Sequence, residues 1–400
     1  MKNKEYTYLF VDNSLYINLE QNIISLMIYL FFKGKPFNFL ERKTNNIVLN
    51  QFVFLNRTFR VFEFIYLFNK KRRIHDKSNG IFPTITSNFS GNCLIVLRQG
   101  ERKIINFREN NVLTYYSRDI GTNTIENRIN TIINSQKCNL APTVINYDIK
   151  KRYIREDYIN LKTPSYNYYN TKHINNELFP ILSKIMTSTN PKVTLLGDYL
   201  NDSTKRLNVV MERYENKDSV KEHNIIRICN FLNDIKKFLR SYPSGKEILM
   251  VFSHGDFWEG NILRSKSRSK VIDWNTLEVR SAYFDFYFIL FHKISQIKEE
   301  TERIYIVEQI DLLFSNFNVY LKENNIISNS NTLNGEYAEF YRYLFYVESI
   351  LLKLQEYSEM DSKYLKVVLS WVELLELYEY NMRSKEEQNQ LELNGIKKLS

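Results

Sequence analysis

The sequence contains few cysteines, glycines and prolines, and these shortages exclude several classes of protein. Its 400 residues include 3 Cys, 11 Gly and 7 Pro. Cys93, Cys138 and Cys229 lie far apart with no C-x-x-C spacing, which argues against a disulfide framework and against a zinc site. So little glycine and proline excludes a collagen-like or low-complexity chain. We therefore expect a globular protein of the reducing cytoplasm.

The chain also lacks a long hydrophobic run. The longest one near the start, Ile23–Phe32 (IISLMIYLFF), has about half the length that a bilayer-spanning helix requires. It has neither the basic leader nor the small-residue cleavage site of a signal peptide. We interpret it as a buried helix or strand, and we expect no membrane span.

Basic residues outnumber acidic ones, and the formal net charge is +10. The basic residues are spread along the chain in short groups such as Lys70–Arg73 (KKRR), and no nucleic-acid-binding motif accompanies them. We therefore expect no nucleic-acid partner. A basic surface of this kind also attracts phosphorylated metabolites.

Composition and periodicity divide the chain into three parts. Hydrophobic residues make up 44% of it, and its length suffices for two or three cores. An aromatic-rich N-terminal extension of unknown role, residues 1–78, ends in a polar run. A β-rich lobe with one helix follows over residues 79–160, and a mainly helical lobe over residues 161–400. We therefore predict an α+β fold of two lobes, a small antiparallel β lobe and a larger helical lobe.

One short segment places several reactive side chains between two apolar ends. Val251–Leu263 (VFSHGDFWEGNIL) contains His254, Asp256 and Asn261, and Asp273 follows in the sequence VIDW. Phosphoryl transfer needs a carboxylate that orients and deprotonates the attacking hydroxyl, ligands for Mg²⁺, and a cation on the phosphates. Asp256 supplies the first kind of group. Asn261 and Asp273 offer the hard oxygen ligands that suit Mg²⁺.

The whole pattern, H-G-D-x-x-x-x-N-I-L followed by V-I-D-W, resembles the aminoglycoside phosphotransferase and choline kinase superfamily, whose fold is protein-kinase-like. The resemblance implies that Asp256 is the catalytic base and that Asn261 and Asp273 bind Mg²⁺. It also implies that Asp285 holds the catalytic loop. His254 belongs to the same catalytic motif, and its alternative role is that of a buried, hydrogen-bonded histidine.

Upstream of this motif, the resemblance points to residues that bind ATP or GTP. Arg118, in a strand that precedes a glycine, would contact the nucleotide phosphates. Arg108 is an equally suited alternative, and Lys103 is a third. Gly91 would let the backbone amides of a phosphate-covering loop approach the nucleotide.

The helix after this strand offers a partner for the phosphate-binding cation. Glu126 is the carboxylate of the segment Thr124–Lys137. An alternative register places Thr131 at the position of the partner, and in that register the ion pair is absent.

The pattern does not give the acceptor. Trp258, Trp274 and Trp371 indicate ordinary packing, with an aromatic cage for a quaternary ammonium group as the alternative. The acidic face of the last helices, which includes Glu373 and Glu376, suggests a cationic acceptor, with a solvated surface as the alternative.

The sequence thus predicts an ATP- or GTP-dependent and Mg²⁺-dependent phosphotransferase. Its acceptor would be a hydroxyl of a small molecule such as an aminoglycoside, an amino alcohol or a sugar. The alternative is a catalytically inactive, kinase-like binding or scaffold protein that uses residues 1–78 and the basic surface. The presence of Asp256, Asn261 and Asp273 together argues against that alternative.

Overall fold

The computed structural model describes residues 4–12, 15–37, 40, 52–77, 82–97, 100–212, 219–327, 335–357 and 365–381. The chain divides into two compact units. The first consists of Met1–Ser165 with Glu259–Thr276, and the second of Tyr166–Trp258 with Leu277–Ser400. Each unit is described by itself below.

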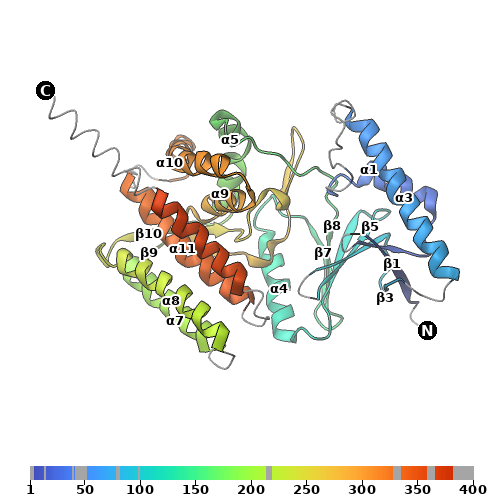
Figure 1. Ribbon diagram of the computed structural model, residues 1–400, viewed down its shortest axis with the longest axis horizontal. Coiled ribbons are helices and arrows are strands. Elements are labelled where there is room, and N and C mark those ends of the chain that lie inside the picture. Colours follow the sequence, from blue (N-terminus) through green and yellow to red (C-terminus); the bar gives the residue numbers. More distant parts are fainter. Residues whose placement is uncertain are drawn as a thin grey trace. The chain divides into compact units, whose positions relative to one another are not determined.

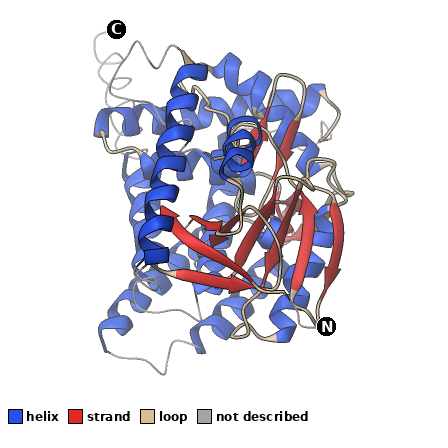
Figure 2. Cartoon of the chain, turned by 90° about the vertical axis from the view of Figure 1, so that its right-hand side faces the viewer, coloured by secondary structure: helices blue, strands red, loops and turns tan. Residues whose placement is uncertain are grey.

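The first unit is built on one antiparallel sheet (Figures 1 and 2). Its strands are β1 (Tyr6–Asp12), β2 (Leu15–Asn18), β3 (Thr84–Ser87), β4 (Cys93–Val96), β5 (Arg102–Asn106), β6 (Asn111–Tyr115), β7 (Val144–Asp148) and β8 (Tyr153–Asp157). Among the described residues, they follow the order β3-β1-β2-β4-β5-β6-β8-β7. Three helices, α1 (Ile23–Lys33), α3 (Val53–Lys77) and α4 (Thr122–Ser135), and the short hairpin of β11 (Ile262–Arg264) and β12 (Ser269–Val271) belong to the same unit.

Residues 1–78 contribute two strands to this sheet, which differs from the predicted boundary at residue 78. β1 pairs with β2 on one side and with β3 on the other, and β2 pairs with β4. The polar run that suggested a boundary is the end of α3, where basic side chains lie on an exposed helix surface. A polar helix end and a polar linker have similar compositions, and composition was the basis of the predicted boundary.

Helix α1 has clear signals at both ends. The side chain of Asn22 accepts a hydrogen bond from the backbone N–H of Ser25, as an N-cap residue does. At the other end, the N–H of Gly34 bonds to the carbonyl oxygen of Leu30. A Cβ atom on Gly34 would lie 2.7 Å from the side chain of Leu40, so glycine is required by packing. The apolar run of the sequence is therefore a helix, and it is buried only on the side of Leu26 and Leu30.

One face of the sheet carries α1 and α3. Alternate residues of the strands point to this face, because side chains along a strand alternate between faces. They form one core with the inner sides of the two helices. Its buried members are Leu9, Val11, Leu15, Ile17, Leu26, Leu30, Phe37, Leu40, Val61, Phe64, Ile65, Phe68, Cys93, Ile105 and Phe107. The opposite face has a smaller buried cluster of Tyr8, Leu94, Ile104 and Leu113.

Helix α4 covers the neighbouring part of the first of these two faces. Ile125, Ile129 and Ile132 lie on one side of α4 and pack against Tyr116 and Ile154. In the register of the sheet, Lys103 is opposite Thr114, and Thr114 is opposite Ile154. Lys103 therefore points to the same sheet face as the core of α4.

The second unit is mainly helical. Its elements are α5 (Thr171–Glu177), α6 (Phe179–Met186), β9 (Lys192–Leu195), α7 (Leu196–Glu212), α8 (Ser219–Leu239), β10 (Glu247–Ser253), β13 (Glu278–Ser281), α9 (Phe284–Gln296), α10 (Glu300–Glu323), α11 (Gly335–Tyr357) and a last helix over residues 365–381. The order β13-β10-β9 gives a small antiparallel sheet. The predicted α+β class, with an antiparallel β part and a helical part, is confirmed. No helix in the described part of the chain is both long and apolar enough to cross a membrane.

Truncation of Leu26 tests whether α1 is an integral part of the first unit. We expect Leu26→Ala to lower the free energy of unfolding by about 2 to 5 kcal/mol, because the side chain is fully buried and its removal leaves a cavity. Urea denaturation followed by circular dichroism measures this loss. Ile24→Ala, in the same helix but on an exposed side chain, is the control. Equal stability of the two variants would contradict the packing of α1 on the sheet.

Candidate active site

The segment around Asp256 follows the end of β10 and is held by one carboxylate. Asp285, in the first turn of α9, accepts hydrogen bonds from Ser253 Oγ at 3.0 Å, from the backbone N–H of His254 at 2.7 Å and from that of Gly255 at 3.0 Å. Gly255 has a φ of 85°, a backbone conformation that glycine adopts at no steric cost. The predicted role of Asp285, to hold the catalytic loop, is confirmed by these bonds.

His254 also stabilises this loop. Its side chain is fully buried, and its Nδ1 accepts the backbone N–H of Asp256 at 3.2 Å. An Nδ1 atom that accepts a hydrogen bond carries no proton. Asp256 itself is half-buried between the buried residues His254 and Phe257. The loop therefore fixes the backbone of Asp256 and leaves its carboxylate partly accessible, which favours the structural role for His254.

In the first unit, the β11–β12 hairpin brings together Asn261 and Asp273. Ile262 pairs with Val271, and the N–H of Ile272 bonds to the carbonyl oxygen of Asn261 at 2.9 Å. Asn261 and Asp273 therefore lie at the same end of the hairpin. Asp273 has a φ of 64°, in the left-handed region that aspartate visits more readily than most residues.

Lys103 on β5 forms an ion pair with Asp273. Burial lowers the pKa of Lys103, but the charge of Asp273 and the hydrogen bond to it outweigh burial, so the pKa is raised overall. Lys103 therefore remains a cation beside the predicted metal ligand. Of the three predicted candidates for the phosphate-binding cation, the structure brings Lys103 to the predicted metal site.

The other predicted nucleotide-binding residues lie elsewhere in the first unit. Arg118 and Arg108 are exposed in the turns that follow β6 and β5, and Glu126 is exposed on α4. An ion pair does join α4 to the start of β5, between Arg128 and the buried Glu101. In this pair the helix supplies the cation, whereas the predicted pair had the carboxylate on the helix. The roles of Arg118, Arg108 and Glu126 in nucleotide binding stay predictions.

Gly91 is tightly packed in this structure. A Cβ atom at Gly91 would overlap the side chain of Ile104 and lie 2.9 Å from the carbonyl oxygen of Ile105. Its own carbonyl oxygen accepts a hydrogen bond from the side chain of Asn18 at 3.0 Å. Packing against β5 and β2 thus requires a glycine here, whatever its role toward a nucleotide.

A cavity of about 260 Å³ lies on the sheet face between the helices of the first unit. Its apolar wall comes from strand, helix and loop residues, and Lys103, Glu156, Asp157 and Asp273 supply charged groups. The lining consists of Pro36, Phe37, Ile95, Leu97, Lys103, Ile105, Val112, Thr114, Ile132, Pro142, Glu156, Asp157, Tyr158, Ile159, Leu263, Ile272, Asp273, Trp274 and Asn275. The cavity thus combines an apolar slot with a cation and carboxylates, which suits a flat ring that carries an anionic tail.

Glu156 and Asp157 are charged cavity residues that the sequence pattern did not identify, and Glu156 has the larger consequence. Burial raises the pKa of Glu156 to about 7, although the charge of Lys103 lowers it. The register of the sheet identifies Glu156 as a cavity residue, because Ile105, Val112 and Glu156 are opposite one another on β5, β6 and β8. That register was not available from the sequence pattern alone.

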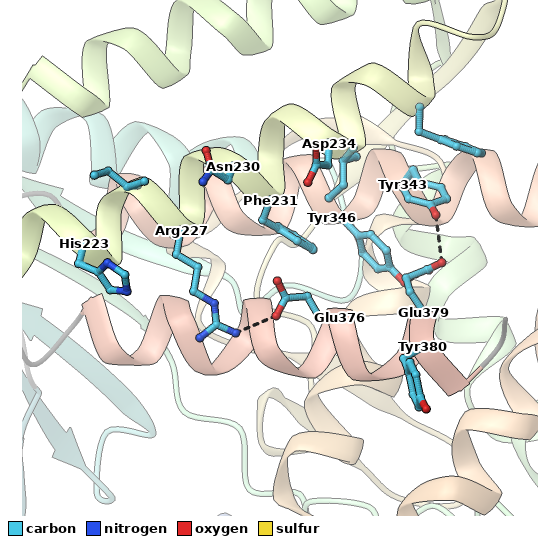
Figure 3. A pocket seen from close by; sticks show the side chains of 13 residues that line it. His223, Arg227, Asn230, Phe231, Asp234, Tyr343, Tyr346, Glu376, Glu379 and Tyr380 are labelled. Atoms are coloured by element: carbon cyan, nitrogen blue, oxygen red, sulfur yellow. Dashed lines mark hydrogen bonds and ion pairs between the residues drawn. The ribbon is translucent and has the colours of Figure 1, made fainter. Parts of the chain in front are cut away.

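A second cavity, a groove of about 570 Å³, lies in the second unit between α8 and the helix over residues 365–381 (Figure 3). The chain already engages its two glutamates, Glu376 and Glu379. Arg227 pairs with Glu373 at 3.0 Å and with Glu376 at 2.8 Å, and Glu379 accepts hydrogen bonds from Tyr343 and Tyr346. The acidic face of the last helix therefore includes ion pairs within the chain, and we assign it no cationic acceptor.

The predicted aromatic cage has a different composition in the structure. The rings of Phe288 and Trp371 stack with their centroids 5.5 Å apart, and the ammonium group of Lys353 lies 4.2 Å from the centroid of Trp371. Trp258 packs on His292, whose pKa is lowered to about 4 by burial and by the charge of Lys353. A cation of the chain thus already occupies one side of this aromatic cluster.

Comparisons with known proteins point to the same class as the motif. Residues 165–309 match the model of the ecdysteroid kinase-like family. This segment includes His254, Asp256 and Asp285, and the match confirms the kinase-like superfamily that the sequence predicted. The chain is thus similar to small-molecule kinases over the segment that contains the catalytic motif. A search of curated proteins finds no significant match.

Several solved structures are partly similar to this chain. The choline kinase LicA from Streptococcus pneumoniae has 12% identity and a TM-score of 0.43, with 68% of this chain and 89% of that chain covered. A glucosamine kinase in complex with glucosamine, ADP and inorganic phosphate has 12% identity and a TM-score of 0.43, with coverage of 74% and 83%. The aminoglycoside phosphotransferase APH(2'')-Ib has 14% identity and a TM-score of 0.35, with coverage of 67% and 94%. With TM-scores below 0.5, these likenesses carry no argument about fold or substrate.

The raised pKa of Glu156 predicts a pH-dependent stability. A carboxyl group whose pKa is raised in the folded protein stabilises it below the ordinary pKa of 4.5, and this contribution is lost as the pH rises through about 7. We therefore expect the melting temperature of the wild type to fall relative to that of Glu156→Gln between about pH 5 and about pH 8.

Melting curves of both proteins across this pH range measure the effect. Glu109→Gln, which changes an exposed glutamate of the same unit, is the control. A constant difference in melting temperature between wild type and Glu156→Gln would show that Glu156 does not titrate in this range.

Proposed function

We propose that the chain is a phosphotransferase that uses ATP or GTP with Mg²⁺ to phosphorylate a hydroxyl group of a small molecule. The observation that carries this proposal is the ion pair between Lys103 and Asp273 at the apolar cavity of the first unit. A nucleotide site needs a cation that contacts the phosphates and a carboxylate that binds their metal ion. The pair of Lys103 and Asp273 offers both. The match of residues 165–309 to a kinase-like family supports the same class of enzyme.

Asn261 and Asp273 fit a magnesium ion by the chemistry of their donor atoms. The hairpin places one amide and one carboxylate at the same end, and both offer hard oxygen atoms. In nucleotide sites, Mg²⁺ is usually held by one or two such groups together with waters and substrate phosphates. When bound, the ion neutralises charge on the phosphate oxygens. Lys103 supplies a second positive charge and holds Asp273 in position.

Asp256 is the group that orients the acceptor hydroxyl and accepts its proton. Its backbone is fixed by His254, and Asp285 fixes the residues before it. Because the transition state of phosphoryl transfer is loose, positioning and charge neutralisation contribute more to the rate than proton removal does. The rigidity of this loop is therefore a direct contribution to catalysis.

The acceptor is a small molecule with a hydroxyl group. The family that matches residues 165–309 is named for ecdysteroids, so a hydroxylated steroid is the first acceptor to test. Quaternary ammonium compounds are disfavoured, because the ammonium group of Lys353 lies over the rings of Trp371 and Phe288. An aminoglycoside, an amino alcohol and a sugar complete the panel.

Nucleotide binding is the first consequence of this proposal. We expect wild-type protein to bind ATP in calorimetry when Mg²⁺ is present, and Asp273→Ala to lose that binding because the metal ligand is gone. Lys103→Met should weaken binding by about tenfold or more, because one charge-assisted contact to phosphate is lost. GTP titrations under the same conditions establish which nucleotide is preferred.

Two exposed arginines provide the matched comparison. Arg108→Met and Arg118→Met remove a cation of the same unit away from the cavity, and we expect them to bind ATP as the wild type does. If Arg118→Met abolished binding while Lys103→Met did not, the role of Lys103 would be wrong. Absence of ATP binding by the wild type under every metal condition would favour the scaffold alternative.

Asp256→Asn separates chemistry from binding. The variant keeps the size of the side chain and removes the base, so we expect unchanged affinity for ATP with Mg²⁺ and a loss of turnover of about 10² to 10⁴. Slow hydrolysis of ATP, with water as the acceptor, provides the assay until the natural acceptor is known. Equal hydrolysis by Asp256→Asn and wild type would remove Asp256 from the mechanism.

A further inference from the structure

Helix α3 carries an exposed row of large apolar side chains. Leu55, Phe59, Phe62 and Tyr66 are 45%, 62%, 55% and 69% exposed. Their spacing of four, three and four residues places them on one side of the helix. Burial of these four side chains would remove a large apolar area from water, and in the described structure this area is exposed.

The row is not the core-facing side of α3. Val61, Phe64, Ile65 and Phe68 form that side, and they are buried against the sheet. The helix is therefore apolar on two sides, one of which packs within its own unit. A helix that served only the core of the first unit would be polar on its outer side.

Helix α1 adds a second exposed row. Ile24, Ile28 and Phe32 are 64%, 47% and 63% exposed and follow one another at intervals of four residues. The two helices contact each other through the rings of Phe31 and Phe54, whose centroids lie 5.2 Å apart. Figure 1 shows the two helices together at the sheet of the first unit.

We name these two rows the outer apolar face. It consists of Ile24, Ile28 and Phe32 of α1 and of Leu55, Phe59, Phe62 and Tyr66 of α3.

A row of basic side chains continues the apolar row of α3. Lys70, Arg73 and Lys77 follow Tyr66 at intervals of four, three and four residues, and all three are exposed. They therefore lie on the same side of the helix as the outer apolar face. The charge changes along the helix, from an apolar row in its first half to a cationic row in its second.

Few carboxylates balance these cations. The sequence of α1 contains no aspartate or glutamate, and α3 contains Glu63 and Asp76. Glu63 pairs with Arg60 at 2.8 Å on α3 itself. A second copy of this chain, docked through the same helices, would offer little negative charge to Lys70, Arg73 and Lys77.

We infer that the outer apolar face and its basic row dock on an anionic membrane surface. Interfacial helices bind membranes with aromatic and aliphatic side chains in the acyl boundary and with lysines and arginines at the anionic headgroups. The outer apolar face supplies the aromatic and aliphatic side chains, and the basic row supplies the lysines and arginine. Both lie on helices that pack on the sheet. This inference does not depend on the proposed phosphotransfer, because none of its residues belongs to the candidate active site.

Vesicle co-sedimentation of the full-length protein tests the inference. One set of vesicles contains phosphatidylcholine alone, and in the other set part of it is replaced by phosphatidylserine. We expect the protein to partition onto the phosphatidylserine vesicles and to dissociate as the salt concentration rises, because surface charges are screened.

Two double variants address the two parts of the surface. Lys70→Gln with Arg73→Gln should lower partitioning by about thirtyfold, since each basic residue near an anionic surface contributes a factor of about five. Phe59→Ser with Phe62→Ser should lower it by about a hundredfold, because two exposed rings no longer enter the acyl boundary. Leu312→Ser with Val319→Ser, on exposed positions of α10, is the apolar control.

Melting curves and ATP binding of each variant confirm that the fold and the nucleotide site are intact. Three results would overturn the inference: no difference between the two vesicle types, equal partitioning of both double variants and the control, or no partitioning at all. Sedimentation equilibrium that shows a dimer dispersed by Phe59→Ser with Phe62→Ser would assign the face to a second copy instead.

Discussion

The ion pair between Lys103 and Asp273 is the interaction on which the candidate site of the first unit depends. Lys103 comes from the middle of the eight-stranded sheet, and Asp273 from a short hairpin that is distant in sequence. The pair places a cation, a carboxylate and an apolar slot next to one another. The charge of Asp273 also keeps Lys103 a cation where burial would otherwise favour its neutral form. The protein thus maintains a charged end in a mainly apolar cavity.

The second unit uses its carboxylates differently. Asp285 accepts three hydrogen bonds from the loop before Asp256, and so fixes a backbone rather than a ligand. Glu376 and Glu379 are bound by Arg227 and by tyrosine hydroxyls. Charged groups that are engaged in this way determine the shape of the unit. Asp256 is half-buried beside a fully buried histidine, and in the proposed function it is the carboxylate that meets the acceptor.

The sequence predicted the features that depend on residues close together in the chain. The motif around Asp256 consists of residues close together in the chain, and the α+β class follows from alternating and helical periodicity. The role of Asp285, which bonds residues 30 to 32 positions earlier, came from the resemblance to a known superfamily. Sequence alone did not choose among Arg118, Arg108 and Lys103. Which strand residues face the cavity is set by register across β4, β5 and β6, and this register places Lys103 there. The place of residues 6–18 within the sheet escaped the prediction for the same reason, since strand pairing over long sequence distances leaves no local signal.

Binding of Mn²⁺ in place of Mg²⁺, followed by electron paramagnetic resonance, tests the central claim most directly. The account predicts that the ion binds tightly with ATP present, that Asp273→Ala abolishes this binding, and that Asn261→Ala weakens it. It also predicts that Arg108→Met, on an exposed side chain, binds the ion as the wild type does. ATP binding that is equally strong without any divalent ion, or a bound ion that is insensitive to Asp273→Ala, would contradict the account.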